Sequence, residues 1–221
     1  MDSLNTGAIT PFHTFDPMQG LSAPVFANLL DAARRGEEID TEAFAISYPD
    51  VVERLESQGI ALSKGREAIE WDDATLLFLA LRKTADDGGP AEPLDRGVSM
   101  ERLGRFPTED GNAISYLREF LIPEEEGDRG SQLLTQLDAG LREEVRGHDN
   151  LSVGFGGMRL HGWLTEVEVC ELRTYLQQSA WKVSQRETFD GGVRDVVRHF
   201  LIILKTAEKR EVGILMRAHG D

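Results

Sequence analysis

The sequence predicts an α+β fold that is mostly helical, with a small antiparallel sheet in its C-terminal part. Residues 151–219 carry the observations that predict it. A glycine-rich segment at 154–162 precedes a strong helix start at Thr165. A second amphipathic helix begins near Val193 and leads into an apolar run at 212–216 that is typical of a strand.

The helix start at Thr165 has the spacing of a capping box. The Thr165 hydroxyl accepts a backbone amide three residues on, and the carboxylate of Glu168 reaches back. Leu164 and Val169 flank the box as a hydrophobic staple. One buried stripe follows at spacings of three and four: Val169, Leu172 and Leu176.

The helix from Val193 has a wider apolar face, made of two adjacent rows. One row contains Val193, Val197, Leu201 and Leu204, and the other contains Val196, Phe200, Ile203 and Ala207. Lys209 and Arg210 lie in the last turn, where the helix dipole favours positive charge. We therefore expect the following apolar run to return as a strand against this helix.

The stretches HGWLTEVEVCELRTYL and LKTAEKREVGILMRAHG resemble the C-terminal part of YfbM-like and related uncharacterised bacterial domains. Those domains share a Leu-Thr-x-x-Glu-Val helix start and a final apolar strand that ends in His. The resemblance covers about a third of the chain. It implies a cytoplasmic bacterial protein of unassigned chemistry, and it carries over no catalytic residue.

Composition along the chain predicts four parts. Residues 1–20 lack periodicity and predict a flexible N-terminal arm, and residues 21–83 predict a helical acidic subdomain with a short hairpin. Residues 84–97 have the composition of a linker or exposed loop. Residues 98–221 then form the α+β domain.

Within the helical subdomain, Ser22 is the expected cap of a first helix and Ser47 that of a second. Alternating residues around the Lys64–Gly65 turn predict the hairpin, and Asp72 or Asp73 caps a third helix. In the C-terminal domain, we expect a helix over 112–122 and another capped by Ser131.

The net charge of −15 is unevenly distributed. Residues 1–150 contain 30 acidic and 14 basic side chains, whereas residues 151–221 contain 9 and 10. This excess disfavours nucleic acid and anionic membranes and favours a basic protein partner. The alternative is that the charge only maintains solubility.

Cys170 is the single cysteine, so no disulfide can form within the chain, and a reducing compartment is indicated. No signal segment and no run of 18 apolar residues occurs in the sequence. We therefore expect a soluble, cytoplasmic protein that does not enter the membrane.

Motifs for chemistry are sparse. The segment at 154–157 lacks the Lys-Ser/Thr of a P-loop, and Met158 to His161 separate it from the next helix, so it predicts a turn or bulge beside a strand. No HExxH, GxSxG or CxxC pattern occurs. We expect no cofactor and no metal.

The sequence favours a protein-binding molecule of the immunity or inhibitor type, with an acidic surface that binds a basic partner. The candidate partner-binding acids lie in loops: Glu37, Glu38, Asp86, Asp87, Glu124, Glu125, Glu126 and Asp128.

Two alternatives remain open. One is a small enzyme or ligand-binding domain near residues 154–161, with His161, His219 and Arg217 as candidate catalytic residues that converge if the last strand pairs nearby. The other is a regulator in which residues 22–81 form a winged-helix-like module. Its candidate recognition helix carries Asp50 and Glu53, which phosphate would repel.

Overall fold

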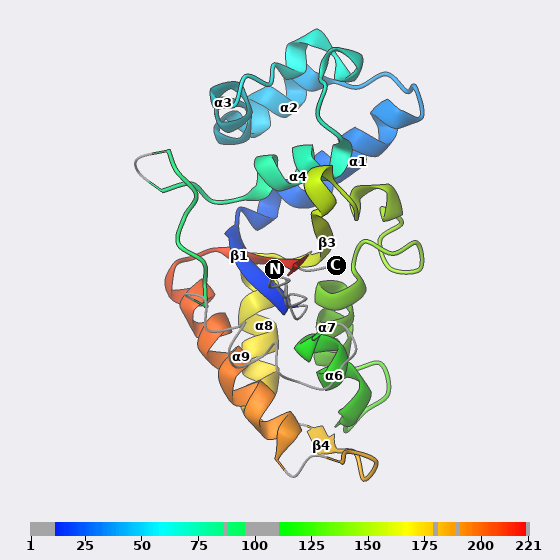
Figure 1. Ribbon diagram of the computed structural model, residues 1–221, viewed down its shortest axis with the longest axis vertical. Coiled ribbons are helices and arrows are strands. Elements are labelled where there is room, and N and C mark those ends of the chain that lie inside the picture. Colours follow the sequence, from blue (N-terminus) through cyan, green and yellow to red (C-terminus); the bar gives the residue numbers. More distant parts are fainter. Residues whose placement is uncertain (1–11, 86–87, 96–110, 179–180, 189–190, 220–221) are drawn as a thin grey trace, which may run out of the picture.

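The computed structural model describes residues 12–85, 88–95, 111–178, 181–188 and 191–219. A three-stranded antiparallel sheet lies between two helical layers, stacked along the long axis of the molecule (Figure 1). The sheet has the order β1-β5-β3, with β1 (Phe12–Met18), β5 (Gly213–His219) and β3 (Arg159–Leu164). A two-stranded sheet, β2 (Leu121–Pro123) with β4 (Trp181–Val183), lies at the far end of the lower layer.

The helices divide between the layers by sequence. The upper layer contains α1 (Ala23–Arg34), α2 (Thr41–Ser47), α3 (Pro49–Ser57) and α4 (Asp73–Leu81). The lower layer contains α6 (Ala113–Phe120), α7 (Arg129–Ala139), α8 (Glu166–Gln178) and α9 (Gly192–Lys209). Strands lie mostly in the C-terminal part, so the predicted α+β class is confirmed.

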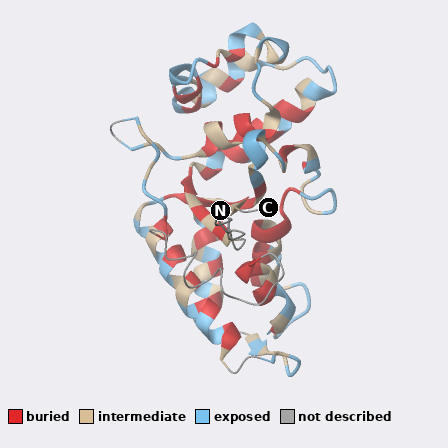
Figure 2. Ribbon diagram, in the orientation of Figure 1, coloured by how far each residue is buried: buried red, intermediate tan, exposed pale blue. Residues whose placement is uncertain are grey.

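The central strand β5 contributes side chains to two hydrophobic cores. Ile214 and Met216 project into the core formed with the lower helices, and Leu215 projects into the core formed with the upper helices. Alternate strand residues point to opposite faces, so one strand can belong to both. Figure 2 shows buried residues concentrated at the sheet and along the inner sides of the helices.

The two predicted C-terminal helices form as expected. The Glu168 carboxylate accepts the Thr165 amide at 2.9 Å, and the Glu168 amide donates to the Thr165 hydroxyl oxygen at 3.4 Å, which is the predicted capping box of α8. The apolar face of α9 is buried and Lys209 lies in its last turn. The strand β5 follows within a few residues.

The predicted flexible arm is wrong for residues 12–20. Residues 12–18 form β1, which pairs antiparallel with β5 from Phe12 opposite His219 to Met18 opposite Gly213. Phe15 and Met18 are fully buried, so this segment contributes to both cores. Residues 1–11 lie outside the described part of the chain.

The predicted hairpin at 60–71 is also wrong. Two short 3₁₀ turns, Leu62–Lys64 and Arg66–Ala68, replace it, and Gly65 joins them with a φ of +82°. The guanidinium group of Arg66 donates to the backbone oxygens of Ile69 and Trp71, which holds the segment as a compact loop. Without the hairpin, residues 22–81 lack the two strands that would form the wing of a winged helix.

Two helix starts differ from their expected positions. The N-cap of α7 is Asp128 and not Ser131, because the Asp128 carboxylate accepts the amides of Gly130 and Ser131. The helix expected from Ser47 begins instead at Pro49, and a separate helix, α2, ends at Ser47.

The boundary between the predicted domains does not separate independent cores. The described residues of the predicted linker are mostly exposed up to residue 93, and then Leu94 packs in the lower core and donates its amide to the Phe15 carbonyl at 3.3 Å. The sheet of the predicted α+β domain at 98–221 is completed by β1, which lies outside that range.

Candidate functional site

One exposed feature is a group of apolar side chains beside the N-terminus of α4, which we call the aromatic patch: Trp71 and Phe155, with Val153 two residues before Phe155 in the chain. The exposed fractions of Trp71, Val153 and Phe155 are 42%, 60% and 77%. The rings of Trp71 and Phe155 meet edge to face, with centroids 6.2 Å apart. Segments 84 residues apart in sequence therefore form one exposed apolar surface, a feature that commonly marks protein contact sites.

A tight turn presents Phe155 in this position. Gly156 and Gly157 have φ values of +69° and +78°, a backbone conformation that residues other than glycine rarely adopt. The Phe155 amide donates to the Asp72 carboxylate at 2.9 Å and to the Thr75 hydroxyl oxygen at 3.2 Å. The glycine-rich segment is thus a turn, as its sequence predicted.

Gly154 allows the turn to lie directly on α4. A β-carbon at this residue would approach the Thr75 hydroxyl oxygen to 2.9 Å and the Asp72 carboxylate to 3.0 Å. Asp72 also caps α4 by accepting the Thr75 amide at 2.8 Å. One carboxylate therefore fixes both segments that carry the aromatic patch.

The patch lies in an acidic stretch of the chain. Residues 67–73 contain Glu67, Glu70, Asp72 and Asp73. Asp73 forms an ion pair with Arg66 at 2.6 Å. Glu67 and Glu70 are exposed and form no ion pair with any residue that the structure describes. Their negative charge is therefore available to a partner that contacts Trp71.

The predicted partner-binding acids do not form one surface. Glu37 and Glu38 follow α1 in the upper layer, whereas Glu124, Glu125 and Glu126 follow β2 in the lower layer (Figure 1). All five are exposed. The hydrogen bond from Arg35 lowers the pKa of Glu37. Asp86 and Asp87 lie outside the described residues.

Asp128, one of the predicted partner-binding acids, also has a structural role. Besides capping α7, its carboxylate accepts a hydrogen bond from the Tyr175 hydroxyl at 3.2 Å. Burial, and after it the Asp128 charge, raise the pKa of Tyr175 to about 12. A carboxylate with these bonds within the chain is poorly placed to bind a partner.

The candidate catalytic residues do not converge. His219 stacks on Phe12 with ring centroids 4.7 Å apart, and its Nε2 lies 2.9 Å from the Thr14 hydroxyl oxygen. His161 instead contacts His13, which is adjacent to Phe12 and therefore projects from the opposite face of the sheet. The last strand pairs with β3, as the convergence required, but the two imidazoles lie on different faces.

Arg217 lies on the same face of the sheet as His219 and forms hydrogen bonds there. Its guanidinium group donates to both carboxylate oxygens of Asp16, at 2.6 and 3.2 Å, and lies 4.7 Å from the centre of the Phe78 ring. Burial lowers the pKa of His219, and the Arg217 charge adds to this effect. These contacts hold β1 and β5 together.

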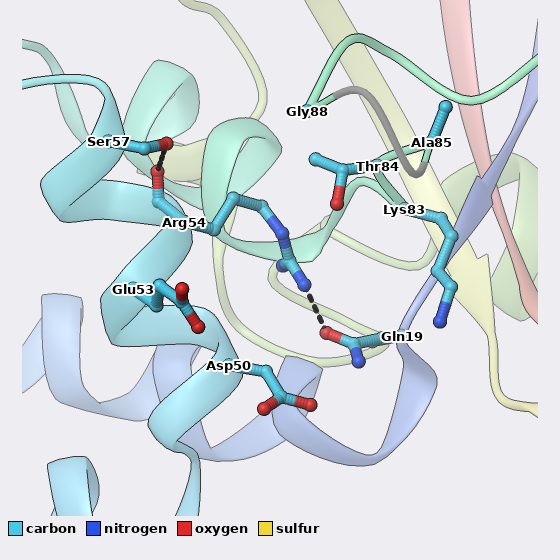
Figure 3. Close-up of a pocket in the computed structure, with 9 residues that line it drawn as sticks. All are labelled: Gln19, Asp50, Glu53, Arg54, Ser57, Lys83, Thr84, Ala85 and Gly88. Atoms are coloured by element: carbon cyan, nitrogen blue, oxygen red, sulfur yellow. Dashed lines mark hydrogen bonds between the residues drawn. The ribbon is translucent and has the colours of Figure 1, made fainter.

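Two surface pockets are lined by residues that the sequence analysis considered: Asp50 and Glu53 line the first, and His161 lines the second. The pocket in Figure 3 has a volume of about 410 Å³, and Asp50 and Glu53 of α3 line one side of it. Arg54 also lines the pocket, and its guanidinium group donates to the side-chain oxygen of Gln19 and to the backbone oxygen of Ala80. Burial lowers the pKa of this arginine. Acidic and basic groups are mixed here, so the pocket does not select one sign of charge.

The second pocket, about 330 Å³, opens beside β3 and the C-terminus of α7. Its polar lining includes Asp138, Arg142, Asp149, Arg159 and His161. It adjoins the aromatic patch at Val153, which also lines it. Within the described residues, no group of three or more His, Cys, Asp or Glu side chains has an arrangement that could hold a metal ion.

The residues that surround Trp71 and Phe155 in the sequence indicated that both side chains are exposed, although the spacing of apolar residues did not. Trp71 follows two glutamates and precedes two aspartates, and Phe155 lies between glycines, so neither belongs to a buried helical stripe. Large aromatic residues in polar, turn-forming surroundings indicate exposure. Their contact could not be read from the sequence, since it depends on how the turn folds onto α4.

The chain matches no protein-family model, no curated protein and no solved structure. None of the helices in the described residues has the length and apolar composition needed to cross a membrane. The fold and site therefore define an α+β protein with an exposed aromatic patch in an acidic stretch.

Proposed function

We propose that this protein binds another protein in the cytoplasm, in the manner of an immunity or inhibitor protein, and that the aromatic patch is the centre of the contact. The observation that carries the proposal is the exposed Trp71 and Phe155 pair, in a stretch of the chain that also contains the exposed Glu67 and Glu70. Tryptophan is enriched among residues that dominate binding energy, and neighbouring charges guide the approach of the partner.

The chemistry of the patch favours a basic partner. The faces of Trp71 and Phe155 attract the guanidinium group of an arginine, and the two glutamates add electrostatic attraction. The chain as a whole carries a net charge of −15, which steers a positively charged protein toward it. The half-exposed single thiol, Cys170, is consistent with a reducing compartment.

Rigid presentation supports the same proposal. The turn that carries Phe155 is bonded to Asp72, and Gly154 packs tightly on α4, so little conformational entropy remains to be lost when a partner binds. The predicted acids in distant loops supply long-range attraction in this proposal, and the aromatic patch supplies the specific contact.

The test is capture from a lysate of the source organism at low and high salt with the full chain as bait. We expect a basic protein whose capture falls at least tenfold with Phe155→Ala or Trp71→Ala. The double variant Glu67→Gln, Glu70→Gln should weaken capture at low salt and reduce its salt dependence. Ile202→Ala is the matched control, because Ile202 is an exposed apolar residue of α9 and lies far from the patch in sequence.

Capture of the same protein, to the same extent, by the Phe155→Ala and control baits would overturn the proposed contact. Capture that is independent of salt and of the two glutamates would overturn the electrostatic part.

A further inference from the structure

The face of the sheet opposite His219 holds a pair of imidazoles that the proposed function does not use. His13 on β1 and His161 on β3 place their Nε2 atoms 3.3 Å apart, with ring centroids 4.8 Å apart and ring planes inclined by 77°. The two residues come from opposite edge strands and are 148 positions apart in sequence.

An irregularity in the backbone of β3 positions the side chain of His161. The register of β3 against β5 shifts between Leu160 and Gly162, and such a bulge redirects the side chain at that point. The His161 carbonyl accepts the Leu141 amide at 3.0 Å, and His161 Nδ1 lies 2.9 Å from the Asp138 carbonyl oxygen. The end of α7 therefore holds both the backbone and the ring of His161.

These contacts determine the tautomer of His161. A carbonyl oxygen only accepts, so Nδ1 carries the proton and donates it to Asp138, and Nε2 presents its lone pair toward His13. A histidine whose second nitrogen donates to a backbone carbonyl is the usual form of a metal ligand. The Asp138 side chain is itself held by Arg118 and Asn112, which fixes this support.

The separation of the two nitrogens matches a shared ion. Two ligand nitrogens, each about 2.05 Å from a tetrahedral zinc ion, lie about 3.3 Å apart. In the metal-free protein the same separation permits His13 Nε2–H to donate to His161 Nε2. An ion about 2.05 Å from both nitrogens lies off the line that joins them, so binding requires both rings to turn and His13 to change tautomer.

The surroundings define the class of ion. Both protein ligands are neutral imidazole nitrogens, which suit zinc, nickel, cobalt or copper, whereas magnesium and calcium prefer oxygen. The Asp138 carboxylate lies 3.8 Å from His161 Nδ1, and Arg118 and Arg159 lie near, so charges of both signs surround the pair. His161 lines the 330 Å³ pocket, which supplies an entry path and room for water ligands.

We propose that His13 and His161 together bind one divalent transition-metal ion, with water completing its coordination. Two protein ligands make this a site of modest affinity.

Zinc titration of the full chain by calorimetry tests the proposal. We expect one ion per chain and an affinity at least tenfold lower in His13→Gln and in His161→Gln. His219→Gln is the matched control, because it removes an imidazole from the other face of the same sheet, and its affinity should equal that of the wild type. Absence of zinc binding, or equal affinity in all four proteins, overturns the proposal.

A measurement on the wild type avoids any dependence on how the variants fold. X-ray absorption at the zinc edge of the loaded protein should show two imidazole ligands at about 2.0 Å. One imidazole, or none, overturns the pair as the site. Circular dichroism of each variant accompanies the titration, and a variant that is not folded is excluded from the comparison.

Discussion

Single glycines set the closest backbone approach in this protein. A β-carbon at Gly162 on β3 would lie 2.0 Å from the Gln136 carbonyl oxygen, and one at Gly140 would meet the same atom at 2.0 Å. The end of α7 thus packs against β3 with no room for a side chain. This approach brings the Asp138 carbonyl to His161.

We predict that Gly162→Ala lowers the free energy of unfolding by about 3 kcal/mol, because the backbone of α7 or β3 must move apart. Denaturant unfolding measures the change. Gly36→Ala is the control: Gly36 has a φ of +70° with nothing within 4 Å of an added β-carbon, so it costs only about 1 kcal/mol of backbone strain. Equal losses in the two variants would mean that close packing at Gly162 has no cost of its own.

His219 makes stability depend on pH. Burial lowers its folded-state pKa below 6.5, with a further contribution from Arg217, while Asp16 and Asp95 oppose the shift. Well above pH 6.5 the imidazole is neutral in both states and the contribution of this residue is complete. As the pH falls below that value, the unfolded chain takes up a proton that the folded protein disfavours, so stability is lost.

We therefore expect the free energy of unfolding to fall as the pH drops below about 6.5, and to fall less in His219→Gln. Urea unfolding at several pH values gives both curves. Parallel curves for the wild type and the variant would exclude His219 as a source of the loss.

Among the secondary-structure elements, α7 begins at a residue whose side chain caps it. Asp128 accepts two amides at its start, so the carboxylate replaces hydrogen bonds that the first turn cannot form internally. Glu124, Glu125 and Glu126 precede it in an exposed turn.

We predict that Asp128→Ala destabilises the protein by about 1–2 kcal/mol through loss of this cap. The triple variant Glu124→Gln, Glu125→Gln, Glu126→Gln should change stability by less than about 0.5 kcal/mol, since exposed substitutions away from special contacts are nearly neutral. Thermal unfolding distinguishes them. A loss in the triple variant as large as in Asp128→Ala would assign these glutamates a structural role as well.

Elements with strong local signals could be predicted from the sequence. The capping box of α8 and the two apolar rows of α9 depend on spacings of three and four residues, which the helix itself imposes. The strand β1 was missed because Asp16 and Pro17 disfavour a strand, although Phe12, Thr14 and Phe15 favour one, and pairing with β5 decides the outcome. Similarly, alternation at residues 60–71 suggested strands, but no strand of the described part of the chain lies beside them to form a ladder.

At the scale of the whole molecule, the sheet joins the two helical layers. The lower core contains Phe15 from β1 in contact with Phe200 from α9, with ring centroids 5.4 Å apart, and the upper core contains Leu215 from β5. The layers share strands, so we expect them to unfold together.

We predict that a fragment of residues 98–221 does not form a stable fold, although its composition suggests a domain. It lacks β1, and the exposed edge and face of β5 would remain unpaired and apolar. Circular dichroism and amide hydrogen exchange of the fragment, compared with the full chain, test this. Cooperative unfolding of the isolated fragment, with protected amides in β5, would contradict it.

The candidate site was less predictable than the fold. Charge indicated a basic partner but not where it binds, because attraction at long range is a property of the whole chain. The pairing of Trp71 with Phe155, and of His13 with His161, joins residues 84 and 148 positions apart. Neither distance is set by any local rule, so both required the tertiary structure.

The position of β5 at the centre of the sheet also bears on how the protein is made. Translation proceeds from the N-terminus, so β1 and β3 leave the ribosome before the strand that must pair with both. Until residues 213–219 emerge, the nascent chain exposes both open strand edges and the apolar faces of the helices beside them. We expect chaperones to bind the unfinished chain, and release to follow within a short time of translation of its last strand.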